Sequence, residues 1–143
     1  MKRSQIREQI FKLLFRIEFN SMDDMPEQVR LFMEAPTLDN DENDSKDVVL
    51  SDSEEKYIVD KYNSIVEHIS EIDKVINETA KGWTADRLGK VELTILRLAV
   101  YEIQYDEDIP ASVAIDQAVE LSKRFGRDES YAFVNGILAK LAK

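Results

Sequence analysis

Apolar residues recur at helical spacing from the first turns of the chain, which predicts an amphipathic helix over residues 4–22. One apolar stripe of this helix consists of Ile6, Ile10, Leu13, Leu14 and Ile17. A second stripe, which runs beside the first, consists of Phe11, Phe15, Phe19 and Met22. Two arrangements fit this pattern: both stripes pack within one bundle, or the aromatic stripe faces another protein chain.

The middle of the chain holds further helical segments. Pro26 suits the first turn of a short helix that ends at Met33, before Pro36. Ser51 or Ser53, followed by acidic residues, predicts the N-cap of a helix that reaches residue 69. Apolar residues at helical spacing then extend or restart this helix up to a stop at Gly82.

The C-terminal half alternates helices and short breaks. An almost wholly apolar segment over residues 91–101 predicts a central buried helix. A further helix begins near Pro110 and ends at Gly126, which we expect to be a left-handed C-cap. Asp128 is predicted to cap the last helix. Its core face consists of Val134, Ile137, Leu138 and Leu141.

No segment shows the alternation of a strand, so the predicted fold class is all-α. A chain of 143 residues suits one domain or two small helical bundles that share an interface. We expect an N-terminal subdomain over residues 1–80, with an acidic loop at 34–53, and a C-terminal subdomain over residues 83–143.

The charge is distributed unevenly, and this matters more than its total of -10. Residues 1–19 carry five basic and two acidic side chains, whereas residues 20–60 carry three basic and thirteen acidic ones. A weakly basic arm therefore precedes an acidic insert, which is compatible with a local RNA footprint. The insert itself reads as a mobile, solvated loop that is dispensable for folding. Its spacing lacks the glycine and glutamate of an EF-hand, so we expect no metal site.

Composition excludes several classes of chemistry. The chain has no cysteine, which removes disulfides, zinc thiolates and thiol nucleophiles and fits a reducing cytoplasm. It has neither a signal-peptide pattern nor the roughly 20 apolar residues of a membrane span. His68 is the only histidine and lies between Glu67 and Glu71, where we expect a solvated side chain. Because no nucleophile or phosphate-binding loop accompanies it, we predict neither catalysis nor a cofactor.

Two regions have the chemistry of a single-stranded RNA contact. Lys2, Arg3 and Arg7 lie at the start of the first helix, where cations can neutralise phosphates. The second region joins basic and aromatic residues before and within the last helix, namely Lys123, Arg124, Arg127, Tyr131 and Phe133. The alternative is that the two aromatic residues belong to the core and the basic residues are ordinary surface charge. The residues alone leave both interpretations open.

Two stretches resemble the NusB family of bacterial antitermination factors. They are residues 82–102, which begin Gly82-Trp83-Thr84 and continue into the apolar helix, and Phe133-Val134-Asn135-Gly136-Ile137-Leu138. The resemblance covers residues 2–141, is densest from Gly82 onward and breaks down between about residues 34 and 53. It implies an all-helical adaptor that binds the boxA element of ribosomal RNA leaders together with the ribosomal protein NusE, joins elongating RNA polymerase and supports antitermination.

The resemblance also implies roles for individual residues. Combined with the charge pattern, it gives the RNA-binding set Lys2, Arg3, Arg7, Arg127, Glu129, Ser130 and Phe133. Phe15, Asp86 and Glu92 match the NusE-binding positions, although Asp86 could instead be a helix cap and Glu92 a surface residue. Ser4, Gln5 and Ile6 stand where many relatives have arginine, so we expect weak intrinsic RNA affinity. Arg97, within the apolar helix, should be structural and paired with a carboxylate or carbonyls.

Two other functions are compatible with an all-helical chain of this composition. In a protein-only adaptor, the aromatic stripe would form a homodimer and the basic arm would be incidental. A similar helical domain occurs fused to RNA methyltransferases, but no methyl-donor loop or room for a catalytic domain follows Leu141. A homodimer that hides the RNA face is a further possibility.

Overall fold

The computed structural model describes residues 2–39, 45–47, 49–80 and 89–142. The chain divides into two compact units, residues 1–64 and residues 65–143. The division falls inside a helix, whereas the sequence predicts a subdomain boundary at residues 80–83. That boundary stays a prediction, because residues 81–88 lie outside the described part of the chain.

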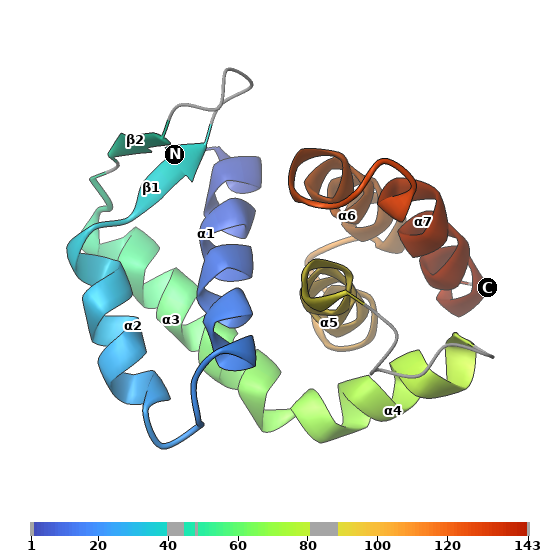
Figure 1. The fold of residues 1–143 in the computed structure, drawn as a ribbon, viewed down its shortest axis with the longest axis horizontal. Coiled ribbons are helices and arrows are strands. Elements are labelled where there is room, and N and C mark those ends of the chain that lie inside the picture. The colour runs from blue at the N-terminus through green and yellow to red at the C-terminus, as the bar shows by residue number, and fades with distance from the viewer. Residues whose placement is uncertain (1, 40–44, 48, 81–88, 143) are drawn as a thin grey trace. The chain divides into compact units, whose positions relative to one another are not determined.

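The first unit begins with α1 (Arg3–Phe15), which places Ile10, Leu13 and Leu14 in the core (Figure 1). A 3-10 turn, η1 (Arg16–Glu18), follows directly, so the prediction that the first helix reaches residue 22 is wrong. The carbonyl of Arg16 accepts the Phe19 N–H at 3.1 Å and the Asn20 side-chain amide at 2.9 Å. These bonds turn the chain out of the helix.

The predicted short helix is present as α2 (Met25–Glu34), with proline in its first turn. Two strands follow, β1 (Thr37–Asp39) and β2 (Ser45–Asp47), which pair antiparallel with Leu38 opposite Lys46. The acidic insert is therefore not wholly the loop that the sequence predicted. Three-residue strands are too short to show alternation in the sequence. Figure 1 shows this hairpin beside α1.

α3 (Asp52–Glu67) begins directly after Ser51, one of the two predicted N-caps. Ser51 Oγ accepts the Glu54 N–H at 3.2 Å, and Glu54 Oε1 accepts the Ser51 N–H at 2.9 Å. These bonds hold the pKa of Glu54 below its ordinary value, the backbone N–H of Ser51 being the main cause. The prediction of a capped helix start is confirmed at Ser51.

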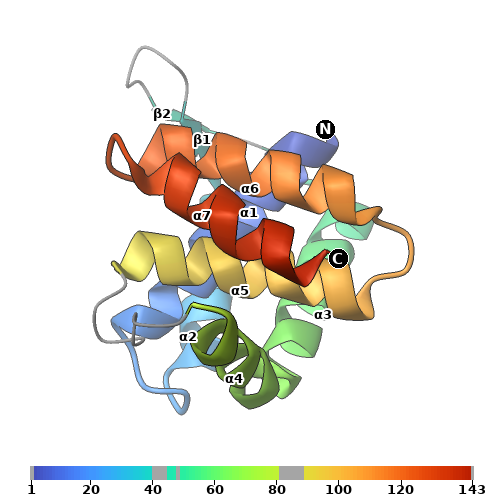
Figure 2. The same cartoon turned by 90° about the vertical axis from the view of Figure 1, so that its right-hand side faces the viewer.

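The second unit is built around α5 (Lys90–Tyr105), which is buried on nearly every side, as predicted. Three helices pack with it: α4 (Ile69–Thr79), α6 (Ala111–Phe125) and α7 (Ser130–Leu141) (Figure 2). The buried residues of α5 include Leu93, Ile95, Leu96, Leu98, Ala99 and Val100. This all-helical core confirms the predicted fold class.

Two predictions about the turn between α6 and α7 are wrong. Gly126 has φ -90° and ψ -176°, which is extended backbone and no left-handed cap. A glycine is needed there for space, since a Cβ would lie 2.7 Å from the Ser122 carbonyl oxygen and 2.8 Å from Ser130 Cβ. Asp128 does not cap α7, because the helix begins at Ser130 and the preceding residue is Glu129.

Candidate functional site

The predicted basic arm is only partly on the surface. Lys2 and Arg3 are exposed, and the Lys2 N–H donates to Gln5 Oε1 at 3.0 Å at the start of α1. Arg7 is only 7% exposed. Glu8 on the same turn is also buried and pairs with Lys12 at 3.0 Å. Two of the three predicted cations therefore remain accessible to a phosphate, while the position of Arg7 favours a structural role.

The aromatic stripe of α1 runs from the core to the surface. The Phe11 and Phe15 rings stack with centroids 6.0 Å apart, and Phe15 meets Phe19 edge to face at 5.0 Å. Phe11 is buried, Phe15 is half-buried and Phe19 is 62% exposed. Met22, beyond the turn, is also exposed. The stripe is thus anchored at one end and open at the other, which combines the two arrangements considered from the sequence.

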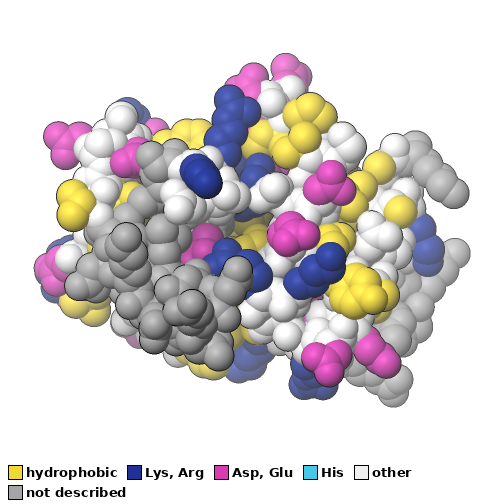
Figure 3. All heavy atoms as spheres, turned by 90° about the horizontal axis from the view of Figure 1, so that it is seen from above, with side chains coloured by type: hydrophobic (Ala, Val, Ile, Leu, Met, Phe, Trp, Pro, Cys, Tyr) yellow, Lys and Arg dark blue, Asp and Glu magenta, His cyan; other side chains and the backbone are white. Residues whose placement is uncertain are grey.

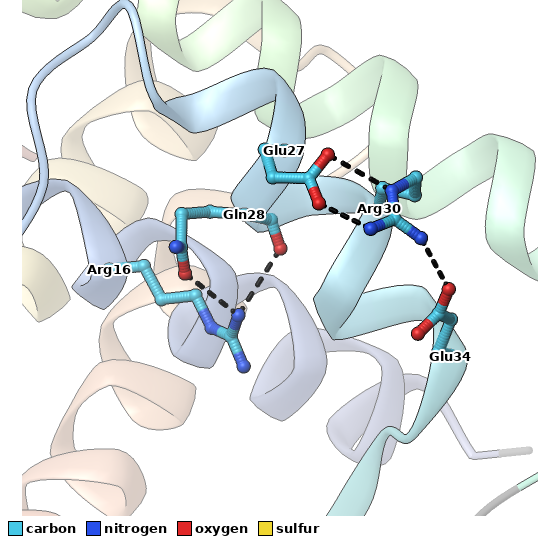
Figure 4. Close-up of polar contacts among 5 residues, drawn as sticks. All are labelled: Arg16, Glu27, Gln28, Arg30 and Glu34. Atoms are coloured by element: carbon cyan, nitrogen blue, oxygen red, sulfur yellow. Dashed lines mark hydrogen bonds and ion pairs between the residues drawn. The ribbon is translucent and has the colours of Figure 1, made fainter.

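Polar contacts fix α2 beside this stripe (Figure 4). Arg16 Nη1 donates to the carbonyl oxygen and the side-chain oxygen of Gln28 at 3.2 and 3.1 Å, and its guanidinium lies 5.3 Å from the Phe32 ring centroid. On the outer side of α2, Arg30 pairs with Glu27 and Glu34. The hydrogen bond from Arg30 lowers the pKa of Glu27, and in return the pKa of Arg30 is raised.

In the second unit, a buried hydrogen-bond chain connects α5 with the start of α7. Ser130 Oγ donates to Glu92 Oε1 at 2.5 Å, and the Arg127 N–H donates to Ser130 Oγ at 2.9 Å. Glu92 and Ser130 are 8% and 6% exposed. The structure therefore joins a residue predicted to bind protein with residues predicted to bind RNA. Sequence spacing gave no sign of this contact between distant segments.

Basic and aromatic side chains meet on α6 and α7. Lys123 Nζ lies 5.5 Å from the centroid of the Tyr131 ring, and the Arg124 guanidinium lies 5.0 Å from that of Phe125. Tyr131 is 43% exposed, so the interpretation of Tyr131 as core is wrong. Phe133 is half-buried, whereas Arg127 and Glu129 are exposed. An exposed ring beside cations is suited to stacking on an unpaired base.

His68 is not the solvated side chain predicted from the sequence. It lies between α3 and α4, and its ring lies 4.2 Å from that of Tyr105 and 6.3 Å from that of Tyr101, measured between centroids. Tyr105 donates its hydroxyl proton to Glu71 Oε2 at 3.0 Å, and this bond raises the pKa of Tyr105. The histidine thus has a packing role where the two helices break.

Arg97 is paired as predicted. Its Nε and Nη2 atoms donate to the two carboxyl oxygens of Asp73 at 2.8 and 2.9 Å, a bidentate contact between α5 and α4. Asp86 and residues 40–44 of the acidic insert lie outside the described residues. Within the described part of the chain, no group of three metal-ligating side chains comes together, and no helix there is long and apolar enough to cross a membrane.

Figure 3 shows basic, acidic and apolar side chains interspersed on one face, with no uniform basic field.

Comparison with protein families gives a match to the NusB family over residues 4–143. A NusB transcription antitermination protein from Agathobacter rectalis is 48% identical, with 99% of this chain and 100% of the relative covered. The chain belongs to the NusB family. A second NusB protein, from Lachnoclostridium phytofermentans, is 40% identical over 99% of this chain and 98% of the relative.

Solved structures of NusB proteins share the fold. Thermotoga maritima NusB has a TM-score of 0.78 and 32% identity, with 99% of this chain and 91% of that chain covered. A crystal structure of the antitermination factors NusB and NusE in complex with double-stranded RNA includes a chain with a TM-score of 0.72 and 25% identity. This match covers 98% of the present chain and 95% of the other. The predicted family resemblance is confirmed over nearly the full length.

Proposed function

We propose that this NusB-family protein is a non-enzymatic adaptor that binds boxA-type leader RNA together with the ribosomal protein NusE. The observation that carries this proposal is the full-length likeness to a NusB chain crystallised with NusE and RNA. The adaptor would act in the cytoplasm, reach RNA polymerase through its complex with NusE and RNA, and support transcription of ribosomal RNA. The adaptor makes and breaks no covalent bond, so its function depends on the free energy of binding alone.

The RNA contacts come from both units. In the first, the exposed Lys2 and Arg3 supply phosphate contacts, while Arg7 supports them from its buried position. In the second, Arg127 supplies charge and Phe133 and Tyr131 supply aromatic surface for unpaired bases, with Glu129 and Ser130 at the start of α7. Few cations are involved, so affinity for RNA alone should be weak and should fall less steeply with salt than that of a protein with many phosphate contacts.

The NusE contact uses the aromatic stripe and acidic side chains. Phe15 is half-buried, and its ring is held between those of Phe11 and Phe19, which gives a rigid aromatic anchor of the kind that dominates protein interfaces. Asp86 belongs to the same proposed set and would attract a basic ribosomal protein. The family likeness also assigns Glu92 to the partner side, although only 8% of it is exposed.

Fluorescence anisotropy of a labelled boxA-like RNA, titrated with the protein alone and with NusE at two salt concentrations, tests the proposal. We expect NusE to tighten RNA binding at least about tenfold, because a second linked contact acts at a high effective concentration. Arg127→Glu should weaken RNA binding. Lys140→Glu, the same charge change on the exposed far end of α7, is the matched control and should not. If the mixture binds no better than the protein alone, the cooperative adaptor is refuted.

A protein-only homodimer is the second candidate, favoured by the exposure of Phe19 and Met22. Light scattering of the protein over a range of concentrations separates the two. A stable dimer that Phe19→Ser dissociates, together with no RNA binding by the NusE mixture, would support the homodimer. A monomer that binds RNA with NusE would exclude it as the main function.

A further inference from the structure

The contact between Glu92 and Ser130 is buried. Both residues are more than nine-tenths buried, and the serine hydroxyl makes two bonds, donating to Glu92 Oε1 and accepting from the Arg127 N–H. A serine hydroxyl that donates and accepts at once has its orientation fixed. The first residue of α7 is therefore locked to the first turn of α5, and the backbone just before α7 is locked to Ser130.

Two glycines leave room for this chain of bonds. A Cβ on Gly89 would lie 2.2 Å from Glu92 Oε2, and a Cβ on Gly126 would lie 2.9 Å from Ser130 Oγ. A side chain at Gly126 would meet the Ser122 backbone as well as Ser130, so it would displace the serine, whereas a side chain at Gly89 would require only the end of the Glu92 side chain to move. The link thus depends on four residues, two that form it and two that are small enough to permit it.

We infer that Glu92 is a positioning residue for the RNA contact, acting through Ser130 on the turn that carries Arg127. This inference rests on the proposed function. Glu92 is 8% exposed, and its bond to Ser130 sets where α7 starts and where the Arg127 backbone lies. Removal of Glu92 would let the α6–α7 turn move, with loss of preorganised RNA contacts.

The inference also gives a physical route between partner and RNA binding. Glu92 lies in the first turn of α5, six residues along the chain from the proposed NusE contact Asp86. A partner that fixes this end of α5 would fix the acceptor of the Ser130 hydroxyl, and so the turn before α7. Cooperative binding of NusE and RNA would then have two sources: the effective concentration of two linked proteins, and the fixing of the turn before α7 when NusE binds.

Four variants in the full chain test this: Ser130→Ala, Glu92→Ala, Glu92→Gln and the Ser130→Ala/Glu92→Ala double variant. RNA and NusE affinities are measured separately for each. Ser130→Ala and Glu92→Ala should each weaken RNA binding measured without NusE about tenfold, roughly the effect of one lost buried hydrogen bond. Ser130→Ala should also leave NusE binding within about twofold. The double variant should lose no more than either single one. Glu92→Gln, which keeps an oxygen acceptor, should bind RNA nearly as the natural protein does.

A readout without RNA completes the test. Hydrogen exchange at the Arg127 amide should accelerate in Ser130→Ala and Glu92→Ala but not in Glu92→Gln, because only the first two remove the Arg127-Ser130-Glu92 chain. The inference is overturned if Glu92→Gln weakens NusE binding as strongly as Glu92→Ala while Ser130→Ala leaves RNA binding unchanged. Failure of the natural protein to bind RNA at all would refute the proposed function, and the inference with it. Unchanged RNA binding by the variants of a competent protein would refute the inference alone.

Discussion

Removal of Asp73 should destabilise the second unit more than removal of its partner Arg97. The Arg97 side chain is 11% exposed and that of Asp73 is 29% exposed. Asp73→Ala leaves a guanidinium buried without this carboxylate, whereas Arg97→Met leaves a carboxylate that water can reach and fills the space with an apolar chain. Asp73→Ala should therefore lower the free energy of unfolding more than Arg97→Met does.

The magnitude follows from burial. Loss of one member of a buried ion pair costs about 3–5 kcal/mol, and the partial exposure of Asp73 lowers this to about 2 kcal/mol for Asp73→Ala. At about 3 °C for each kcal/mol in a chain of this size, its melting temperature should fall by about 6 °C. For Arg97→Met we expect about 1 kcal/mol, since the exposed carboxylate regains hydration and the methionine keeps apolar contacts.

Urea unfolding followed by circular dichroism measures both variants and the double variant. The double variant should be less destabilised than the sum of the two single ones, with a coupling of about 1–2 kcal/mol. Asp60→Ala serves as the control, because it breaks the exposed Lys56–Asp60 pair and should leave the urea midpoint unchanged. A larger loss for Arg97→Met than for Asp73→Ala, or purely additive losses, would refute this reasoning.

Three further predictions concern stability. Ser51→Ala should cost about 1 kcal/mol, seen as a lower urea midpoint, because it removes the acceptor of the Glu54 N–H; an unchanged midpoint would show that the cap contributes nothing. Gly136→Ala should raise the melting temperature, since nothing lies within 4 Å of an added Cβ and alanine favours a helix by about 1 kcal/mol, whereas Gly126→Ala should lower it through close contacts; the reverse order would contradict the packing. The pKa of Tyr105 is raised in the folded state, so the protonated hydroxyl contributes to the free energy of unfolding. This contribution is complete below the ordinary tyrosine pKa of 10.0 and is lost as pH rises through the pKa of the folded state. Tyr105→Phe should therefore reduce the fall in the urea midpoint between about pH 9 and 11, a range that brackets the ordinary tyrosine pKa of about 10.

Local patterns predicted most of the helices and the N-cap before α3, because spacing and cap residues act over one or two turns. Arg97 could be recognised as paired, since a cation in an apolar helix requires a counter-charge. Its partner could not be named, because Asp73 lies 24 residues away on another helix. The stacking of His68 on Tyr105 was missed for the same reason, as it depends on how α4 and α5 pack.

The candidate site shows the same limit. The four-residue spacing of Phe11, Phe15 and Phe19 indicates one stripe, but only tertiary structure shows burial at one end and exposure at the other. Charge pattern placed Arg7 with the exposed arm, yet packing encloses it. The bond between Glu92 and Ser130 spans 38 residues, beyond the reach of any periodicity. Residue types thus predict which chemistry is present, and the fold decides which side chains can use it.

The open end of the aromatic stripe has a consequence for the colloidal behaviour of the protein. Phe19 is 62% exposed and Met22 47%, so two molecules that meet there could bury apolar surface. A net charge of -10 opposes such encounters through long-range repulsion. At about 0.15 M salt this repulsion is screened beyond about 8 Å, and less of the barrier remains at higher ionic strength. Concentrated samples should therefore stay clear at low salt and become turbid as salt is added, and masking of this surface by a bound partner should suppress the turbidity.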